Sequence, residues 1–258
     1  MSIMKFDFAG QVTIITGAAG NLGAAVARAF SGAGAKLALI DRATERFPTL
    51  FPDFAQSPDC FLAPPTDGAD LGAVSLAVDK IKQRFGRIDI LINNAAIFAT
   101  IPMNRGGIDS IDPVEWDRMM AVNLKGLFFC CRAVLPAMRQ QKSGKIVNIS
   151  SGTALNGSAG RIHYVTSKAG VIGFTRTLAR EVGDDNINVN AIAPGSTLSE
   201  DNPSEEILKM RGARVGDRCL KRVQLPKDLV GTVLFLSSPL SDFMTGQTVS
   251  VDGGTAFL

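Results

Sequence analysis

A tyrosine and a lysine four residues apart, Tyr164 and Lys168, are the pair best suited to catalysis in this chain of 258 residues. Tyr164 is the only tyrosine. Positions i and i+4 lie on one face of a helix, so both side chains are expected to point the same way. A tyrosine that exchanges protons near neutral pH needs a pKa well below its usual value of about 10. An ammonium about 5 Å away favours the phenolate by about 3 kcal/mol, so the pair predicts a general acid or base.

Ser151 is the second candidate for a chemical role. It directly follows a predicted strand, Lys145–Ser150. A serine at the carboxyl end of a parallel strand reaches the edge of the sheet where ligands bind. There its hydroxyl can hydrogen-bond a substrate oxygen, although capping of the following loop explains the residue equally well.

A glycine-rich turn, Thr16–Gly23, separates the first predicted strand from the first predicted helix. Glycines in this position let backbone N–H groups approach a phosphate, which the dipole of the helix also favours. The turn therefore predicts a dinucleotide site, and a tight turn without a ligand is the alternative. The expected cofactor contacts in the turn are Gly17, Gly20, Asn21, Leu22 and Gly23.

Asp41, at the end of the second predicted strand, decides the expected cofactor. A carboxylate there accepts hydrogen bonds from the ribose hydroxyls of adenosine. It would also repel a 2′-phosphate by about 4 kcal/mol at about 4 Å and an effective dielectric constant near 20. We therefore expect NAD, while the neighbouring Arg42, whose guanidinium can bind a phosphate, keeps NADP as the less favoured choice.

The elements that must position these residues alternate between short apolar runs and helical patterns. This alternation is typical of a parallel sheet that helices cover on both faces. The predicted fold is an α/β, doubly wound (Rossmann) sheet of about seven strands, with residues 1–258 as a single dinucleotide-binding and catalytic domain. The expected strands are Val12–Thr16, Lys36–Asp41, Cys60–Ala63, Ile88–Asn93, Lys145–Ser150, Ile187–Ile192 and Thr248–Val251. The expected helices are Asn21–Phe30, Leu71–Phe85, Pro113–Gln140, Tyr164–Val182 and Lys227–Leu236.

Three long connections separate these elements. Prolines make a regular helix doubtful in Arg42–Pro58. Ala95–Asp112 and the polar loop 196–225, in which only Ser204–Arg211 has a helical pattern, are expected either to cover the substrate or to be disordered.

Composition excludes several classes of protein. The 27 Lys and Arg are mixed with 24 Asp and Glu, so we expect no nucleic-acid groove and no basic membrane patch. Neither a signal peptide nor a run of about 18 apolar residues is evident, which predicts a soluble, cytoplasmic protein. With one histidine and no Cys-x-x-Cys pair we expect no metal site. The four cysteines are predicted to be reduced core residues: Cys60, Cys130, Cys131 and Cys219.

The motifs occur in an order that resembles the short-chain dehydrogenases/reductases of the single-domain type. Thr16–Gly23, Ser151, and the Tyr164 and Lys168 pair match that family's glycine turn, serine and Tyr-x-x-x-Lys motif. The resemblance implies that Tyr164 exchanges the proton, that Lys168 holds the cofactor ribose, and that Asn123 supports a proton relay. It implies further cofactor contacts from Asn94, Ala95, Tyr164, Lys168, Pro194 and Gly195, and it implies a homotetramer.

The chain departs from the family pattern at three positions. Asn21 replaces the second glycine of the turn, and Ala96 replaces the last glycine of the Asn-Asn-Ala-Gly motif. Pro64 stands where an aspartate that binds adenine is common, so we expect that contact to be lost or to move to a neighbouring backbone group.

The resemblance implies an NAD-dependent oxidoreductase that interconverts a secondary alcohol and its ketone. A 3-oxoacyl-carrier-protein reductase using NADPH is the alternative within the family, and a dinucleotide-sensing module without turnover is the alternative outside enzymes. His163–Lys168 and Arg222–Leu236 resemble the aryl-alcohol dehydrogenases of this family, such as 1-phenylethanol dehydrogenase.

The substrate pocket is expected to be largely apolar. No ring of Arg or Lys converges on the cleft in the sequence pattern, which argues against a strongly anionic substrate. His163 has two interpretations: contact with the substrate or a neighbouring subunit, and a surface histidine that caps the helix. The candidate substrate contacts are Phe98, Ile101, Met103, Leu155 and His163.

Overall fold

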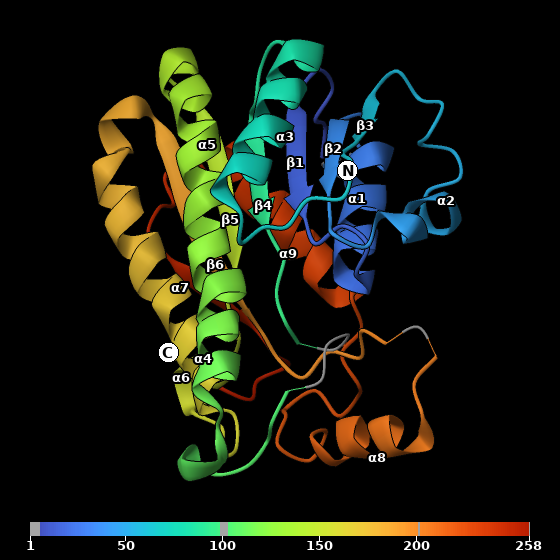
Figure 1. Cartoon of the computed structure of the whole chain (residues 1–258), viewed down its shortest axis with the longest axis vertical. Coiled ribbons are helices and arrows are strands. Elements are labelled where there is room, and N and C mark those ends of the chain that lie inside the picture. Colours follow the sequence, from blue (N-terminus) through green and yellow to red (C-terminus); the bar gives the residue numbers. More distant parts are fainter. Residues whose placement is uncertain (1–5, 99–102, 201, 258) are drawn as a thin grey trace, which may run out of the picture.

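A seven-stranded parallel sheet forms the centre of the molecule (Figure 1). The computed structural model describes residues 6–98, 103–200 and 202–257. The strand order β3-β2-β1-β4-β5-β6-β7 reverses direction between β1 and β4, which confirms the predicted doubly wound sheet. The strands are β1 (Val12–Thr16), β2 (Lys36–Ile40), β3 (Cys60–Leu62), β4 (Ile90–Asn93), β5 (Gly144–Ile149), β6 (Ile187–Pro194) and β7 (Thr248–Val251).

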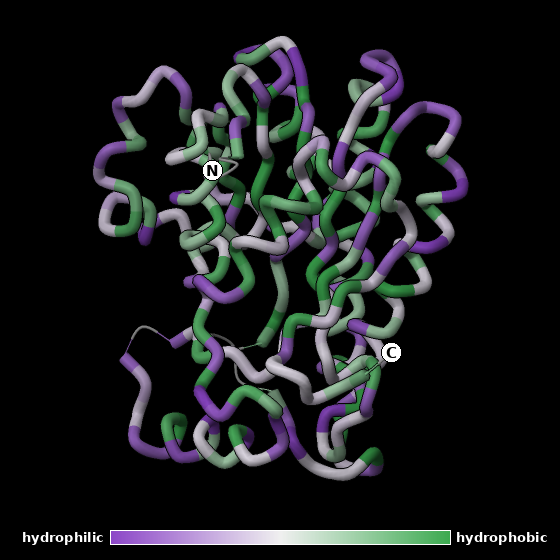
Figure 2. The backbone as a smooth tube through the Cα atoms, turned by 180° about the vertical axis from the view of Figure 1, so that it is seen from behind, coloured by the Kyte–Doolittle hydropathy of each residue, from purple (hydrophilic) through white to green (hydrophobic). Residues whose placement is uncertain are grey.

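Helices cover both faces of the sheet. One buried apolar cluster joins the sheet to α3, α5 and α7, and a second joins it to α1 and α9. Figure 2 accordingly shows hydrophobic positions along the inner strands and hydrophilic ones at the outer turns. Strands buried on both faces read as continuous apolar runs, which is why the sequence predicts them well. The helices are α1 (Asn21–Gly32), α2 (Phe47–Leu50), α3 (Leu71–Phe85), α4 (Pro113–Met120), α5 (Gly126–Gln141), α6 (Thr153–Asn156), α7 (Ile162–Glu181), α8 (Glu205–Ala213) and α9 (Lys227–Ser237).

The single helix predicted for Pro113–Gln140 is two α-helices joined by a π-helical turn, Ala121–Lys125. By length and composition alone, the whole run Pro113–Gln141 is the one described helix that could cross a membrane. Charged residues, among them Lys125 and Arg132, interrupt the apolar ones along this run. In the fold α5 packs against α3, and α4 packs against α7, as core helices of the domain do.

Two other expectations can be compared with the structure. In Arg42–Pro58, which is described throughout, helical structure is limited to a 3-10 turn, Thr44–Arg46, and the single turn of α2. The prediction that all four cysteines are core residues is wrong for Cys219, which is exposed. Burial raises the pKa of the Cys60 and Cys130 thiols to about 12, as expected for inert core residues.

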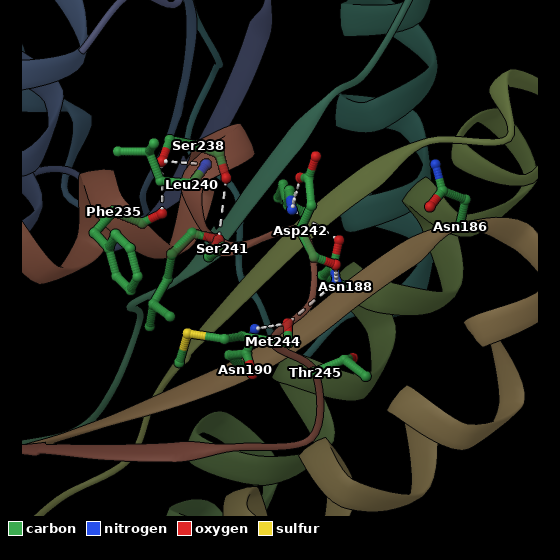
Figure 3. A network of polar contacts seen from close by, with 12 residues as sticks. Asn186, Asn188, Asn190, Phe235, Ser238, Leu240, Ser241, Asp242, Met244 and Thr245 are labelled. Atoms are coloured by element: carbon green, nitrogen blue, oxygen red, sulfur yellow. Dashed lines mark hydrogen bonds and ion pairs between the residues drawn. The ribbon is translucent and has the colours of Figure 1, made fainter. Parts of the chain in front are cut away.

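Asparagines of β6 hold the connection that leads from α9 to β7 (Figure 3). The side-chain amide of Asn188 donates to the carbonyl oxygens of Asp242 at 2.9 Å and Met244 at 3.1 Å. The amide of Asn190 donates to the same Met244 oxygen at 2.8 Å. These bonds hold the connection to β7 beside the start of β6. Because β7 runs parallel to β6, Asp252, which follows β7, lies at the carboxyl ends of the strands.

Candidate active site

A cavity of about 860 Å³ lies at the carboxyl ends of the strands. Residues that follow each of β1 to β7 contribute to its wall, and so does α8, which stands beyond the end of the sheet (Figure 1). Ser151, Tyr164 and Lys168, predicted from separate motifs, all line this cavity. The topology therefore brings the three candidate catalytic residues to one place.

Tyr164 is buried at the start of α7, with 5% of its surface exposed. Burial raises the pKa of Tyr164, and a hydrogen bond with the Ser151 side chain acts in the opposite direction. The Ser151 hydroxyl is itself held 2.9 Å from the hydroxyl of Thr153, in the first turn of α6. Sequence analysis missed Thr153, because a threonine in an unpredicted one-turn helix carries no distinctive pattern.

Lys168 lies one helical turn beyond Tyr164 and is buried. Its ammonium donates a hydrogen bond to the carbonyl oxygen of Ile149 at 2.8 Å, and burial lowers the pKa of Lys168 to about 8. The charges that lower the pKa of Tyr164 in this structure are instead those of Arg161 and Arg211. Lys168 is not among the causes of the Tyr164 pKa shift, and the expectation that its ammonium lowers that pKa stays a prediction.

Asn123 occupies the π-helical turn between α4 and α5 and is buried. Its side-chain oxygen accepts from the backbone N–H of Ile97 at 2.7 Å, and its amide donates to the hydroxyl of Ser167 at 3.2 Å. The side chain of Asn123 thus links three segments behind the site, while its neighbour Val122 lines the cavity. Single π-helical turns of this kind often occur at functional sites.

The turn before α1 fits the pyrophosphate of a dinucleotide. In the part of the chain that the structure describes, no side chain caps the N-terminus of α1, and the first turn holds no acidic residue. A Cβ at Gly17 would lie 2.7 Å from the Cα of Ala95, and one at Gly23 would lie 2.3 Å from the oxygen of Gly17. Only glycine fits these two positions, and the uncapped N–H groups with the helix dipole suit an anion.

Asp41 is held in a fixed orientation at the end of β2. One carboxylate oxygen accepts from the N–H of Ala19 at 2.8 Å and the other from the N–H of Ala43 at 2.9 Å. Arg42 and Arg46 line the same end of the cavity. After β3 the cavity is lined by Thr66, Asp67 and Gly68 and not by Pro64, and the loss of the usual adenine contact at Pro64 stays a prediction.

Most of the predicted cofactor contacts lie in the cavity wall. Gly23 does not, because its role is close packing against Gly17. The residues found there are Gly17, Gly20, Asn21, Leu22, Asp41, Arg42, Asn94, Ala95, Pro194 and Gly195.

Fewer of the predicted substrate contacts lie in the cavity wall. Phe98 lines the cavity, whereas Leu155 and His163 do not. His163 has no exposed surface, and its Nε2 lies 3.1 Å from a carboxylate oxygen of Glu115. The interpretation of His163 as a surface histidine is therefore wrong, and its ring faces Glu115 rather than a substrate. Ile101 lies outside the described residues.

Several arginines line the cavity near Tyr164, contrary to the sequence analysis, which found no ring of cations there. Arg105 follows β4, Arg161 directly precedes α7, Arg211 belongs to α8, and Arg214 directly follows α8. These arginines could not be predicted as a group from the sequence, because three separate segments supply them. One signal was available: Arg161 stands only three residues before Tyr164 in the sequence.

Comparisons with known proteins agree with this geometry. Residues 11–206 match the family model described as short chain dehydrogenase. A probable galactose dehydrogenase of Rhizobium meliloti is 38% identical over 253 residues, which cover 96% of each chain. A 3-oxoacyl-(acyl-carrier-protein) reductase of Thermotoga maritima is 37% identical over 251 residues, covering 95% of this chain and 97% of the relative. Among solved structures, a short-chain dehydrogenase/reductase from Brucella melitensis, titled a glucose/ribitol dehydrogenase, superposes with a TM-score of 0.86 at 27% identity, covering 99% of this chain and 100% of that one.

Proposed function

Because this chain belongs to the short-chain dehydrogenase family of NAD(P)-dependent oxidoreductases, we propose that it interconverts a secondary alcohol and its ketone with NAD. In this proposal residues 1–258 act as one dinucleotide-binding and catalytic domain. The observation that carries it is that Tyr164 and Ser151 line the same cavity as the turn before the uncapped N-terminus of α1.

Each catalytic side chain has a distinct task in the proposed reaction. The nicotinamide, when bound, takes up or supplies the hydride at the substrate carbon. Ser151 donates a hydrogen bond to the substrate oxygen and holds it beside Tyr164. Tyr164 gives its proton to that oxygen when a ketone is reduced and takes it back when an alcohol is oxidised. Burial raises the pKa of Tyr164, contrary to the lowered pKa that the sequence predicts, which favours proton donation to a ketone and opposes proton removal from an alcohol; the charges of Arg161 and Arg211 act against this rise.

Lys168 and Asn123 are proposed to support the reaction without touching the reacting substrate atoms. Lys168, in the cavity wall, is proposed to hold the cofactor ribose with the ammonium hydrogens that Ile149 leaves available. The side chain of Asn123 binds Ile97 and Ser167 and so fixes the backbone of the π-helical turn. We propose that this fixed backbone supports a proton relay toward Lys168.

The preference for NAD rests on Asp41. Its carboxylate is oriented by the amides of Ala19 and Ala43 at the end of the cavity proposed for the adenosine ribose. A 2′-phosphate there would face a fixed negative charge. Arg42 and Arg46 line the same end of the cavity, and their positive charges would attract the 2′-phosphate of NADP. The preference for NAD therefore depends on the repulsion by Asp41 exceeding this attraction, which a kinetic comparison of NAD and NADP can measure.

A cytoplasmic homotetramer remains the expectation for the assembly, as the family resemblance implies. The outer faces of α5 and α7 suit such an interface, because Phe128 is 41% exposed and a Cβ at Gly173 would meet no atom within 4 Å. Apolar and small residues on exposed helix faces permit close helix packing between subunits.

A screen of secondary alcohols with NAD, and of ketones with NADH, tests the proposed function. Turnover is followed at the absorbance of the reduced cofactor. We expect at least one alcohol–ketone pair to be turned over, with a higher kcat/KM for NAD than for NADP. Tight NADH binding without turnover of any member of a broad panel would support a sensing module and contradict the proposal.

A further inference from the structure

Guanidinium groups from three segments converge beside the proposed proton donor. Arg161 and Arg211 act electrostatically on Tyr164, and each lowers its pKa. Arg105, Arg211 and Arg214 act in turn on Arg161, whose pKa is lowered by burial and by these neighbouring charges. All of these side chains line the cavity, so its substrate end carries a concentration of positive charge.

Acidic partners neutralise only some of these arginines. Arg211 pairs with Glu200 at 2.5 Å, and Arg214 lies 3.8 Å from a carboxylate oxygen of Asp217. Within residues 6–98, 103–200 and 202–257, neither Arg105 nor Arg161 forms an ion pair. These two charges are available to a ligand.

Arg161 and Arg105 make hydrogen bonds only to uncharged groups among the described residues. Arg161 donates to the hydroxyl of Ser158, and Arg105 donates to the sulfur of Met210 at 3.3 Å. Arg161 is half-buried, and a partly desolvated cation among other cations is unfavourable unless it gains a negative partner. The missing partner is supplied most directly by a bound anion.

Arg211 marks the inner wall of this end of the cavity. It is 5% exposed, and its guanidinium lies 5.5 Å from the ring centre of Phe98. The Phe98 ring packs in turn against Tyr164, with 5.1 Å between ring centres. Bonds to Glu200 and Ser196 hold Arg211, yet its buried Nε has no hydrogen-bond partner among the described residues. A buried donor without a partner also indicates a polar ligand nearby.

We infer that the substrate of the proposed oxidoreductase carries an oxyanionic group, a carboxylate being the simplest, which Arg161 and Arg105 bind while the carbonyl lies at Tyr164. This inference rests on the proposed function and names its substrate class. Guanidinium groups bind carboxylates through paired, charge-assisted hydrogen bonds. The cofactor pyrophosphate is a separate anion, since its expected place is the N-terminus of α1.

Matched ketones that differ in one charge test the inference. We would compare 4-acetylbenzoate with its methyl ester, and acetoacetate with methyl acetoacetate, as substrates with NADH and as competitive inhibitors. In the wild type we expect each acid to exceed its ester about tenfold or more in kcat/KM or in inhibition. In Arg161→Gln and Arg105→Gln we expect the acids to lose about 10- to 100-fold, as for a lost hydrogen bond to a charged group, and the esters to change less than about threefold.

Arg180→Gln is the matched control, because Arg180 is exposed on α7, the helix that Arg161 directly precedes, and lies outside the cavity wall. It removes the same charge and should leave the preference for acids unchanged. The KM for NADH should stay constant in all three variants. If the esters equal the acids in both pairs, or if the preference survives in both Arg161→Gln and Arg105→Gln, the inference is overturned.

A binding measurement separates this inference from the proposed function. Thermal shift of the NADH-loaded protein by the same four compounds needs no turnover. If the acids raise Tm in an Arg161-dependent way but no ketone is reduced, the anion site stands and the proposed reaction fails. If esters are reduced as well as acids, the proposed reaction stands and the anion site is refuted.

Discussion

The side-chain oxygen of Asn123 accepts a hydrogen bond from the backbone N–H of Ile97 at 2.7 Å. This bond joins the π-helical turn between α4 and α5 to the segment that follows β4. Ile97 lines the cavity, whereas Asn123 lies behind it. The buried side-chain amide of Asn123 therefore ties the π-helical turn to the segment after β4, at the carboxyl ends of the strands.

Replacing Asn123 by Leu should destabilise the protein and lower its activity. The N–H of Ile97 would lose its partner in a buried place, which costs about 1–3 kcal/mol in the free energy of unfolding. Urea denaturation measures this loss. Ser167→Ala removes the bond from the Asn123 amide and the bond from the Ser167 hydroxyl to the carbonyl oxygen of Tyr164, but it keeps the bond to Ile97 and should cost less. An Asn123→Leu protein as stable as the wild type would show that the π-helical turn does not need this bond.

Replacing Asp41 by Ser should reduce the preference for NAD. The substitution removes the negative charge that a 2′-phosphate would meet, and it leaves Arg42 and Arg46 to attract that phosphate. We expect the ratio of kcat/KM for NAD over NADP to fall about tenfold or more, which corresponds to about 1.4 kcal/mol. Asp67→Ser is the control, since a residue after β3 should affect both cofactors alike. An unchanged ratio in Asp41→Ser would contradict the proposed role of Asp41.

Replacing Lys168 by Met should change how stability depends on pH. Burial lowers the pKa of Lys168 from 10.5 to about 8, so below pH 8 the folded protein must keep an ammonium in a buried place. Above pH 10.5 the lysine is neutral in both states and this cost disappears. The wild type should therefore gain stability relative to Lys168→Met between pH 8 and 10.5, by up to about 3 kcal/mol.

Urea denaturation of both proteins from pH 7 to pH 10 measures this difference. Comparing the two proteins cancels the titration of the cysteines, which they share. A difference that stays constant over this range would show that Lys168 is not desolvated in the folded protein.

The fold could be predicted from the sequence because its signals are local. Each strand is a short apolar run buried on both faces, and nearly every predicted bound lies within two residues of the observed one. Ser151, Tyr164 and Lys168 were found because a strand end and an i, i+4 spacing on one helix fix where such side chains meet. The π-helical turn at Asn123 was not found, since it depends on bonds to Ile97 and Ser167 in other segments.

The substrate end of the site could not be predicted, because long loops build it. Arg105, Arg161 and Arg211 are far apart in the chain and are brought together only by how loops and α8 fold over the sheet. The burial of His163 could not be predicted for a related reason: its partner Glu115 lies on a different helix, so nothing in the local pattern indicates a buried pair.

Turnover by Tyr164→Phe, measured beside its affinity for NADH, tests the central claim most directly. The substitution removes one hydroxyl and keeps the ring that packs against Phe98. With a substrate pair found by the screen, kcat should fall by about 10²- to 10⁴-fold, the usual contribution of a general acid, while the Kd for NADH stays within about threefold. A Tyr164→Phe enzyme that retains wild-type turnover would contradict the assignment of Tyr164 as the proton donor, and the proposed mechanism with it.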